Sequence, residues 1–186
     1  MARIAELRGI ASIASLPETR GGTELRTWII AIAAITTTGG PALAQVPAQA
    51  PSLEFVFEEI VTLAPAVTPG TTPRGGRRII PITGGSFEGP AIRGQVMPGG
   101  WDWQLDRPDG CTDVVADYFL KTDDGVVINV RNIGTLCRDR PVRTHPVFEA
   151  PIGKYDWLNK TAFLGTLELG PGAPGSSVKI RFYQVR

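Results

Sequence analysis

The chain has few residues of the types that carry metal or nucleophilic chemistry. It contains one histidine, His145, and two cysteines. Because structural zinc sites and most copper sites need several histidine or cysteine ligands, we expect neither a metal nor a cofactor. No Gly-x-Ser-x-Gly nucleophile motif is present either. A single histidine without such a motif is more typical of a structural or exposed loop position than of a catalytic pair.

A long apolar run is also missing. Residues 28–35 (WIIAIAAI) form an apolar stretch of eight, which is too short to cross a bilayer as a helix. Arg20 and Arg26 precede it, and residues 42–44 (Ala-Leu-Ala) follow it. A basic flank, a short apolar segment and an Ala-x-Ala exit predict that residues 1–44 are a secretory signal peptide. A buried strand or helix is the alternative.

Export predicts a periplasmic or secreted protein that has no membrane anchor once the signal peptide is removed. Residues 45–52 are then a Pro/Ala linker, and residues 53–186 form a single domain. Removing the four basic and three acidic residues of the signal peptide leaves 15 of each sign. Nucleic-acid binding needs clustered basic charge, so a neutral domain does not predict that partner.

Strand patterns repeat along the domain, while helical periodicity is nearly absent. Ten glycines fall between Gly70 and Gly110, where they predict the bends and bulges that let a sheet close. The sequence therefore predicts an all-β fold with little or no helix: a closed antiparallel β-barrel of about eight strands, lipocalin-like in size. A β-sandwich is the alternative. The expected strands are residues 53–63, 78–87, 91–97, 112–121, 126–134, 146–149, 161–169 and 178–185, with a turn-rich loop at 65–76.

One hairpin predicts its own register. A turn at residues 123–125 (Asp-Asp-Gly) pairs residues whose numbers sum to 248. A charge pair and a cysteine pair then coincide, and a slip of one residue would separate both. In an exported protein this register predicts a disulfide. The expected neighbours are Phe119 with Asn129, Asp117 with Arg131, and Cys111 with Cys137.

Two acids and one arginine are the candidate catalytic groups. Glu88 follows Phe87, and Asp102 lies between two tryptophans, where desolvation would raise the pKa of each carboxyl toward a useful range. Arg107 could stabilise an oxyanion or bind a substrate carboxylate. The structural alternative is that Asp102 caps the preceding Gly-Gly turn and that Arg107 pairs with a neighbouring acid.

Aromatic and polar side chains are the candidate ligand-binding groups, and we expect the partner to be a small, aromatic molecule. The alternatives are that the loop aromatics only close the barrel end and that the hairpin face is solvent-exposed. The loop aromatics are Trp101, Trp103, Tyr155 and Trp157. The hairpin residues, expected to face a lumen, are Asp117, Phe119, Asn129 and Arg131.

Ordered motifs over nearly the whole domain resemble an uncharacterised bacterial and fungal family, domain of unknown function 3237. The resemblance implies a closed antiparallel barrel. Asp117 stands where the family usually has an arginine before the tyrosine matching Tyr118, so the chain departs from the family's pattern of charges at this position. The motifs include residues 76–85 (GRRIIPITGG), 87–90 (FEGP), 98–100 (PGG), 102–104 (DWQ), 107–110 (RPDG), 146–149 (PVFE) and 155–159 (YDWLN).

The sequence therefore supports two hypotheses. The first is an isomerase, cyclase or lyase that transfers protons between carboxyl groups and a small aromatic or polyketide-like molecule. The second is a ligand-binding barrel without chemistry. Only the enzyme requires a carboxyl with a raised pKa inside the pocket. Whether the chain forms a homo-oligomer is left open.

Overall fold

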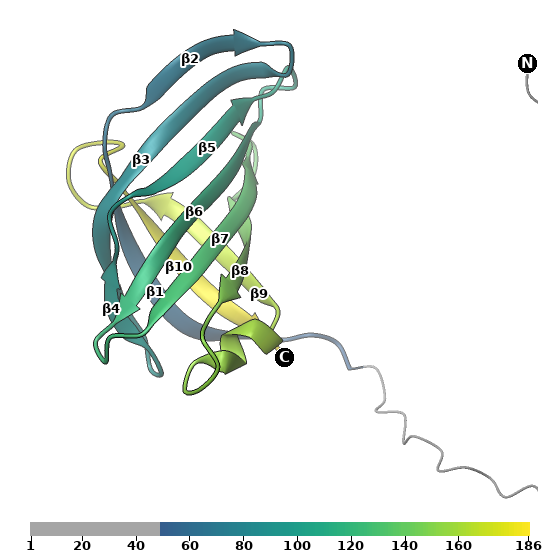
Figure 1. Ribbon diagram of the computed structural model, residues 1–186. Helices are drawn as coiled ribbons and strands as arrows, with labels where there is room; N and C mark the ends of the chain where they lie inside the picture. The colour runs from purple at the N-terminus through teal and green to yellow at the C-terminus, as the bar shows by residue number, and fades with distance from the viewer. Residues whose placement is uncertain (1–48) are drawn as a thin grey trace, which may run out of the picture. The chain divides into compact units, whose positions relative to one another are not determined.

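Ten β-strands and one short 3-10 helix make up residues 49–186, the part of the chain that the computed structural model describes (Figure 1). The predicted signal peptide and residues 45–48 of the predicted linker lie outside the described residues. The elements are β1 (Leu53–Leu63), β2 (Val67–Thr72), β3 (Gly75–Glu88), β4 (Arg93–Val96), β5 (Gly100–Asp106), β6 (Thr112–Thr122), β7 (Val127–Leu136), β8 (Arg143–Glu149), η1 (Asp156–Lys160), β9 (Phe163–Leu169) and β10 (Ser177–Val185).

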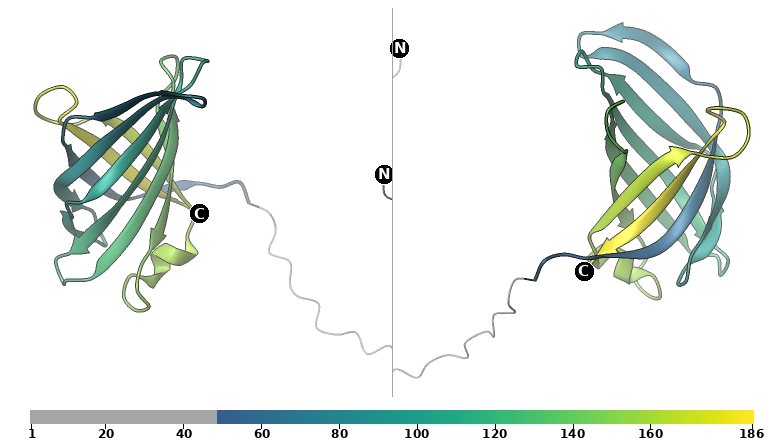
Figure 2. Two further views of the ribbon diagram at one scale, coloured as in Figure 1. Left: turned by 45° about the horizontal axis from the view of Figure 1, so that its top comes forward. Right: turned by 180° about the vertical axis from the view of Figure 1, so that it is seen from behind.

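The strands close into an antiparallel barrel, as the sequence predicts (Figure 2). β1 closes the ring because it pairs with β10 on one side and with β3 on the other. β4 and β5 follow one another in the same position between β3 and β6, so the ring has eight strand positions. β2 lies outside the ring and forms a hairpin with the first half of β3.

Two strands differ from the sequence-based expectation. β2 occupies part of residues 65–76, which were expected to be a loop, and β5 occupies residues 100–106, which were expected to be a glycine turn with loop aromatics. Pairing of β5 with strands on both sides overrides the local turn signal. Gly99, with φ +105°, is located at the break between β4 and β5. A Cβ on Gly100 would lie 2.4 Å from Cβ of Tyr118, so the close approach of β5 to β6 requires glycine there.

One half of the barrel interior is filled by a packed apolar core. Phe57, Phe148 and Phe182 contact one another, with ring centroids 4.8 to 5.9 Å apart. Leu158 of η1 is buried against this cluster. The short helix lies beside the end of β8 and the start of β9 (Figure 1). Asn159 helps to hold η1 there, since its side chain bonds both backbone groups of Ala150 at 2.8 Å. The short helix therefore closes the packed end.

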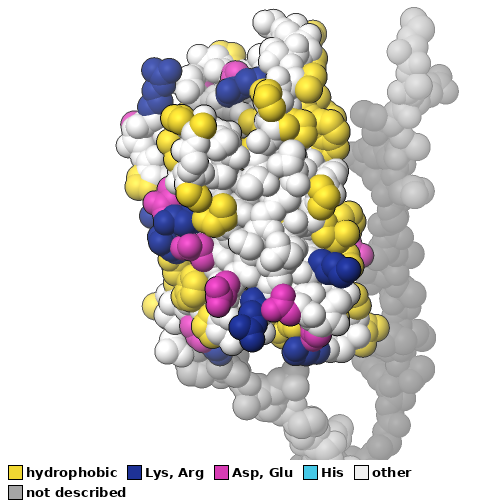
Figure 3. Space-filling view, turned by 90° about the vertical axis from the view of Figure 1, so that its left-hand side faces the viewer, with side chains coloured by type: hydrophobic (Ala, Val, Ile, Leu, Met, Phe, Trp, Pro, Cys, Tyr) yellow, Lys and Arg dark blue, Asp and Glu magenta, His cyan; other side chains and the backbone are white. Residues whose placement is uncertain are grey.

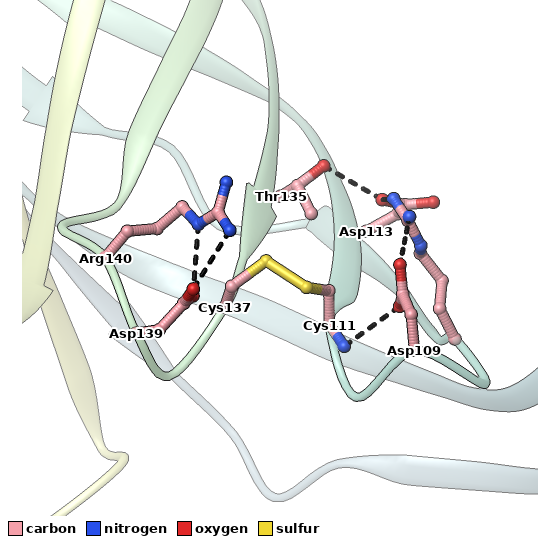
Figure 4. A network of polar contacts seen from close by, with 8 residues as sticks. Asp109, Cys111, Asp113, Thr135, Cys137, Asp139 and Arg140 are labelled. Atoms are coloured by element: carbon pink, nitrogen blue, oxygen red, sulfur yellow. Dashed lines mark hydrogen bonds and ion pairs between the residues drawn. A yellow bond between two sulfur atoms is a disulfide. The ribbon is translucent and has the colours of Figure 1, made fainter.

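The predicted hairpin register is confirmed over the length of β6 and β7, which pair with residue numbers summing to 248. Cys111 and Cys137 form a disulfide immediately beyond the ladder, with Cα atoms 4.5 Å apart (Figure 4). That separation is typical of non-hydrogen-bonded antiparallel neighbours, which is the phase of the ladder that accommodates a cross-strand disulfide. Polar contacts flank the bridge, including the bond from Thr135 Oγ1 to Asp113 Oδ1 at 2.9 Å.

Charge is mixed on the barrel surface. Figure 3 shows basic and acidic side chains interspersed on one face, without a continuous field of either sign. Cross-strand ion pairs account for part of this pattern, such as Arg181 with Glu58 at 2.7 Å. Within residues 49–186, no helix has the length and apolar character needed to cross a membrane.

Candidate functional site

The half of the barrel away from η1 encloses a cavity of about 310 Å³. That volume is at the lower end of the range for small-molecule sites. Its walls are mainly aliphatic, with a few polar side chains among them, which is the composition expected of such a site. The polar lining residues are Arg78, Asp102, Gln104, Tyr118, Asn132 and Thr144, and the apolar ones include Val61, Leu63, Ile80, Ile82, Val114, Leu136, Leu167 and Ile180.

The strand register arranges these polar groups in three inward-facing rows. The row next to the core contains Tyr118, the middle row contains Asp102 and Asn132, and the outer row contains Arg78, Gln104 and Thr144. Alternate residues of a strand share a face, so cross-strand neighbours within a row all point inward. The rows are Ile82–Gly100–Tyr118–Val130–Phe148, Ile80–Asp102–Ala116–Asn132–Pro146 and Arg78–Gln104–Val114–Gly134–Thr144.

Asp102 is the acid in the middle of the cavity wall. Its Oδ2 accepts a hydrogen bond of 2.7 Å from Gln104 Nε2, whereas its Oδ1 is buried and has no partner among the described residues. Burial raises the pKa of Asp102, while the Gln104 hydrogen bond and the charge of Arg78 act in the opposite direction. The carboxyl therefore has a raised proton affinity and one oxygen free to accept a proton.

A second acid lies at the boundary between cavity and core. Glu59 is fully buried, and its Oε1 accepts a hydrogen bond from the Tyr118 hydroxyl. Burial raises the pKa of Glu59 to about 8, and the bond from Tyr118 only partly offsets this rise. The pKa of Tyr118 is also raised, by its own burial and by Glu59. At neutral pH the pair therefore consists of a protonated acid behind a phenol that lines the cavity.

Arg78 connects the cavity to its outer rim. Its Nη2 bonds Asp106 Oδ1 at 2.7 Å, while its Nε is buried without a partner among the described residues. Arg78 and Leu136 also line an open groove on the rim, together with Arg107 and the disulfide. The guanidinium is therefore positioned to meet a ligand that enters from this end.

Asn132 and Thr144 supply two more unpartnered groups to the cavity. Both side chains are buried, and Asn132 Oδ1 and Thr144 Oγ1 have no hydrogen-bond partner among the described residues. Ala116 separates Asn132 from Asp102, so a small residue lies between two polar ones. A Cβ on Gly165 would lie 2.1 Å from Thr144 Oγ1, so glycine there leaves room for the hydroxyl. Because buried polar atoms are normally hydrogen-bonded, these atoms are candidates to bond a ligand or water in the cavity.

The structure does not bring the three predicted catalytic residues together. Asp102 lines the cavity, but Glu88 is exposed at the end of β3, and Arg107 is exposed on the rim. Arg107 Nη1 bonds Asp113 Oδ1 at 3.1 Å and its Nη2 bonds Asp109, which is the structural alternative considered from the sequence. Neither Glu88 nor Arg107 lines the cavity that contains Asp102.

The hairpin residues expected to face a lumen lie on the outer wall instead. The strand period of two places Tyr118 and Asn132 inward, so their neighbours in the sequence point outward. The predicted cross-strand pairs are correct. The prediction of which face of the hairpin points inward is wrong, because the opposite face lines the cavity. The outward residues are Asp117, Phe119, Asn129 and Arg131, which are exposed apart from the half-buried Asn129.

The four predicted aromatic residues do not form one mouth. Trp101 and Trp103 flank Asp102 on β5 and point outward, with 41% and 44% of their surface exposed. Tyr155 is buried and bonds Asp124 Oδ1 at 3.0 Å. Trp157 is half-buried and packs against Phe163 at 6.2 Å between ring centroids. The last two belong to the closed end of the barrel, which is the plugging role considered from the sequence.

Sequence reasoning missed Glu59, Arg78, Gln104, Tyr118, Asn132 and Thr144. The sequence did contain a signal for Glu59. It alternates with Phe57 and Val61 along β1, which places an acid on the inward face of an apolar strand. A β-bulge between Phe55 and Phe57 changes which residues of β1 face inward, so Phe55 is exposed while Phe57 is buried. Within residues 49–186, no cluster of three or more His, Cys, Asp or Glu has an arrangement that could hold a metal ion.

Comparison with known proteins places the chain among uncharacterised ones. Residues 51–185 match the family model described as protein of unknown function (DUF3237). A UPF0311 protein of Rhodopseudomonas palustris is 37% identical over 135 residues, covering 62% of this chain and 88% of the relative. A UPF0311 protein of Clostridium acetobutylicum is 31% identical over 152 residues, covering 71% and 92%.

Solved structures show the same barrel. A β-barrel-like protein of Acinetobacter baumannii matches with a TM-score of 0.68 at 30% identity, covering 76% of this chain and all of that one. A protein described as a hydroalkoxylation enzyme, from Penicillium herquei, is 29% identical over 140 residues, covering 75% of this chain and 87% of that one. The crystal structure of an enzyme from the same fungus matches with a TM-score of 0.61 at 25% identity, covering 76% and 98%.

Proposed function

Because the chain belongs to the DUF3237 family of proteins of unknown function, whose relatives include one hydroalkoxylation enzyme, we propose that it catalyses a proton-transfer addition inside the barrel. The reaction class is the addition of a hydroxyl group across a carbon–carbon double bond, or its reverse. The substrate is a small unsaturated alcohol or phenol that fits the 310 Å³ cavity. The observation that carries the proposal is the Asp102 carboxyl, with its raised pKa and its free Oδ1 in the cavity wall.

In this proposal Asp102 is the general base and Tyr118 the general acid. Asp102 pairs with Ala116, two residues before Tyr118 on β6, so Asp102 and Tyr118 are diagonal neighbours about 7–8 Å apart. A reacting group fits between side chains at that separation. In the structure the Tyr118 hydroxyl donates to Glu59 Oε1. In the proposed step this hydroxyl turns toward the substrate, and Glu59, protonated at neutral pH, donates its own proton to the Tyr118 oxygen as the phenol gives its proton up.

The proposed step balances without an external reagent. The substrate hydroxyl loses its proton to Asp102 as its oxygen bonds to one alkene carbon. The π bond breaks, and the other carbon takes a proton from Tyr118, which Glu59 replaces. Exchange with water after product release returns a proton from Asp102 to Glu59. Arg78 stabilises the carboxylate form of Asp102 electrostatically, consistent with its lowering effect on that pKa.

The test is turnover of alkenols and alkenyl phenols in deuterated water. Cyclic ether formation with one deuterium on carbon supports the proposal, because the carbon-bound proton then comes from an exchangeable acid. Asp102→Asn removes the base and should lower the rate by about 10²- to 10⁴-fold. Asp123→Asn, at an exposed acid of the β6–β7 turn, is the matched control and should leave the rate unchanged.

A binding barrel without chemistry is the second candidate, favoured by the largely aliphatic cavity lining. The same experiment separates the two. Saturable binding of an alkenyl phenol with no deuterium incorporation, equal in Asp102→Asn and the unmodified protein, would support the binding barrel and exclude the enzyme.

We further propose that the protein is exported, with residues 1–44 removed. The Cys111–Cys137 disulfide supports this proposal, since such bonds persist in oxidising compartments. N-terminal sequencing of protein from the periplasm or medium should begin at Gln45. Recovery of an uncleaved chain from the cytoplasm with two free thiols would contradict export.

A further inference from the structure

The outer wall of β5 to β8 exposes several large apolar side chains. Trp101, Trp103, Ile133 and Val147 are exposed by 41%, 44%, 36% and 53%. Large apolar side chains gathered on one exposed face, with polar residues among them, are typical of an interaction site. We call this surface the indole wall and define it as Trp101, Trp103, Val115, Asp117, Arg131, Ile133, His145 and Val147.

The strand register arranges the indole wall in two adjacent rows of four. The first row is Trp103–Val115–Ile133–His145, and the second is Trp101–Asp117–Arg131–Val147. Each row crosses β5, β6, β7 and β8 in that order. A line between β6 and β7 therefore divides each row into two halves. The residue on β6 lies as far from this line as the residue on β7, and the residue on β5 as far as the residue on β8.

We propose that the indole wall is the interface of a two-fold symmetric homodimer. A two-fold axis parallel to the strands, between β6 and β7, would place β6 of one copy over β7 of the other and β5 over β8. Such an isologous contact uses the same surface on both subunits, so it must be complementary to itself. The indole wall meets that requirement at every position.

The facing groups are chemically matched in all four cases. Val115 meets Ile133 of the second copy, which joins two aliphatic side chains. Trp101 meets Val147 and Trp103 meets His145, so each indole covers a smaller side chain. Asp117 meets Arg131, which gives two opposite-charge contacts because the axis repeats each one. Charge complementarity of this kind fixes register and excludes unmatched partners.

Barrel curvature is also accommodated. The wall is convex, so the gap between two copies widens away from the axis. The two largest side chains of the wall are on β5, away from the axis, where they can span the wider gap. Near the axis, where the two copies are closest, the smaller side chains of Val115 and Ile133 make the contact. Tryptophan and arginine are also the residue types that contribute most often to interface energy.

The central charges have no competing ion pair within the described residues. Asp117 Oδ1 accepts a hydrogen bond of 2.8 Å from the uncharged Asn129 side chain. Arg131 is exposed and forms no ion pair with any residue of 49–186. Both side chains are therefore free to pair with a second copy.

The test is a charge-swap cycle followed by analytical ultracentrifugation of the mature protein, from 1 to 100 µM. Asp117→Arg alone would set two arginines against each other, and Arg131→Asp alone two aspartates. Each single variant should raise the dimer dissociation constant at least tenfold. The double variant Asp117→Arg/Arg131→Asp restores opposite charges across the axis and should recover most of the lost affinity. Val115→Arg should abolish the dimer.

Gln95→Arg, at an exposed position of β4 outside the indole wall, is the control and should leave the dimer intact. Thermal unfolding of each variant shows whether the fold is kept. A monomer throughout the concentration range overturns the proposal, including the case in which the wall binds a different protein. A dimer that the single variants leave unchanged, or that the double variant does not restore, overturns it as well.

Discussion

The Tyr118 hydroxyl donates a hydrogen bond to Oε1 of Glu59, and both residues are buried where the cavity meets the packed core. The bond joins β1 to β6 across the interior of the barrel. It places a neutral acid behind a phenol that lines the cavity. The other oxygen of Glu59 has no partner among the described residues. Burial disfavours the charged carboxylate, so the pKa of Glu59 is raised and the protonated form is the more stable one.

The pH dependence of the free energy of unfolding should reveal the raised pKa of the Glu59 carboxyl. The pKa of Glu59 is about 8 in the fold and 4.5 in the unfolded chain. Between those values the unfolded state loses the proton first, so the free energy of unfolding falls as pH rises from about 5 to 8, by roughly 3–4 kcal/mol. Glu59→Gln mimics the protonated acid and should remove this fall, which urea unfolding at pH 5 and pH 8 measures.

The difference between the variant and the unmodified protein isolates Glu59 from other titrating groups. The two proteins should have similar stability at pH 5, and the variant should be the more stable at pH 8. An equal pH dependence in both would show that Glu59 titrates normally and would remove the proton reservoir from the proposed mechanism.

Filling the cavity should prevent ligand binding without unfolding the barrel. Ala116→Leu adds three carbons between Asp102 and Asn132, at a cost in stability of about 1–3 kcal/mol. Binding of 2-allylphenol, followed by calorimetry, should be lost. Ala91→Leu makes the same change at an exposed position and is the control. Retained affinity in Ala116→Leu would place the ligand outside the barrel.

The disulfide should contribute measurably to stability. It closes a loop with a sequence separation of 26 residues. The chain-entropy model gives about 3 kcal/mol for such a loop. Cys111→Ser/Cys137→Ser should lower the urea midpoint accordingly, and dithiothreitol should lower that of the unmodified protein but not of the variant. Identical midpoints with and without reductant would mean that the bond stabilises nothing.

The fold was largely predictable because it depends on local patterns. Alternation, glycine positions and one hairpin turn gave the barrel and the register that pairs Cys111 with Cys137. The register fixes which residues are neighbours across strands, but the inward face also depends on how the whole sheet curves. For that reason the hairpin residues Asp117 and Arg131 were expected inside although they are outside.

The site was only partly predictable. Asp102 was identified from its two flanking tryptophans, but the residues that line the cavity with it come from seven other strands, most of them distant in the sequence. Arg78 and Glu59 each lie within a predicted strand, and nothing local marks either as part of a site, because only ring closure brings β1 and β3 together. Long-range pairing of this kind has no local signal.

The pKa of Asp102 tests the central claim most directly, because its measurement needs no knowledge of the natural substrate. Carboxyl carbon NMR titration of the unmodified protein and Asp102→Asn would assign the resonance, and adding 2-allylphenol would show whether a ligand reaches it. The account predicts a pKa above the ordinary 3.8 and a resonance that shifts on ligand addition. An ordinary pKa, together with a resonance that the ligand leaves unchanged, would contradict it.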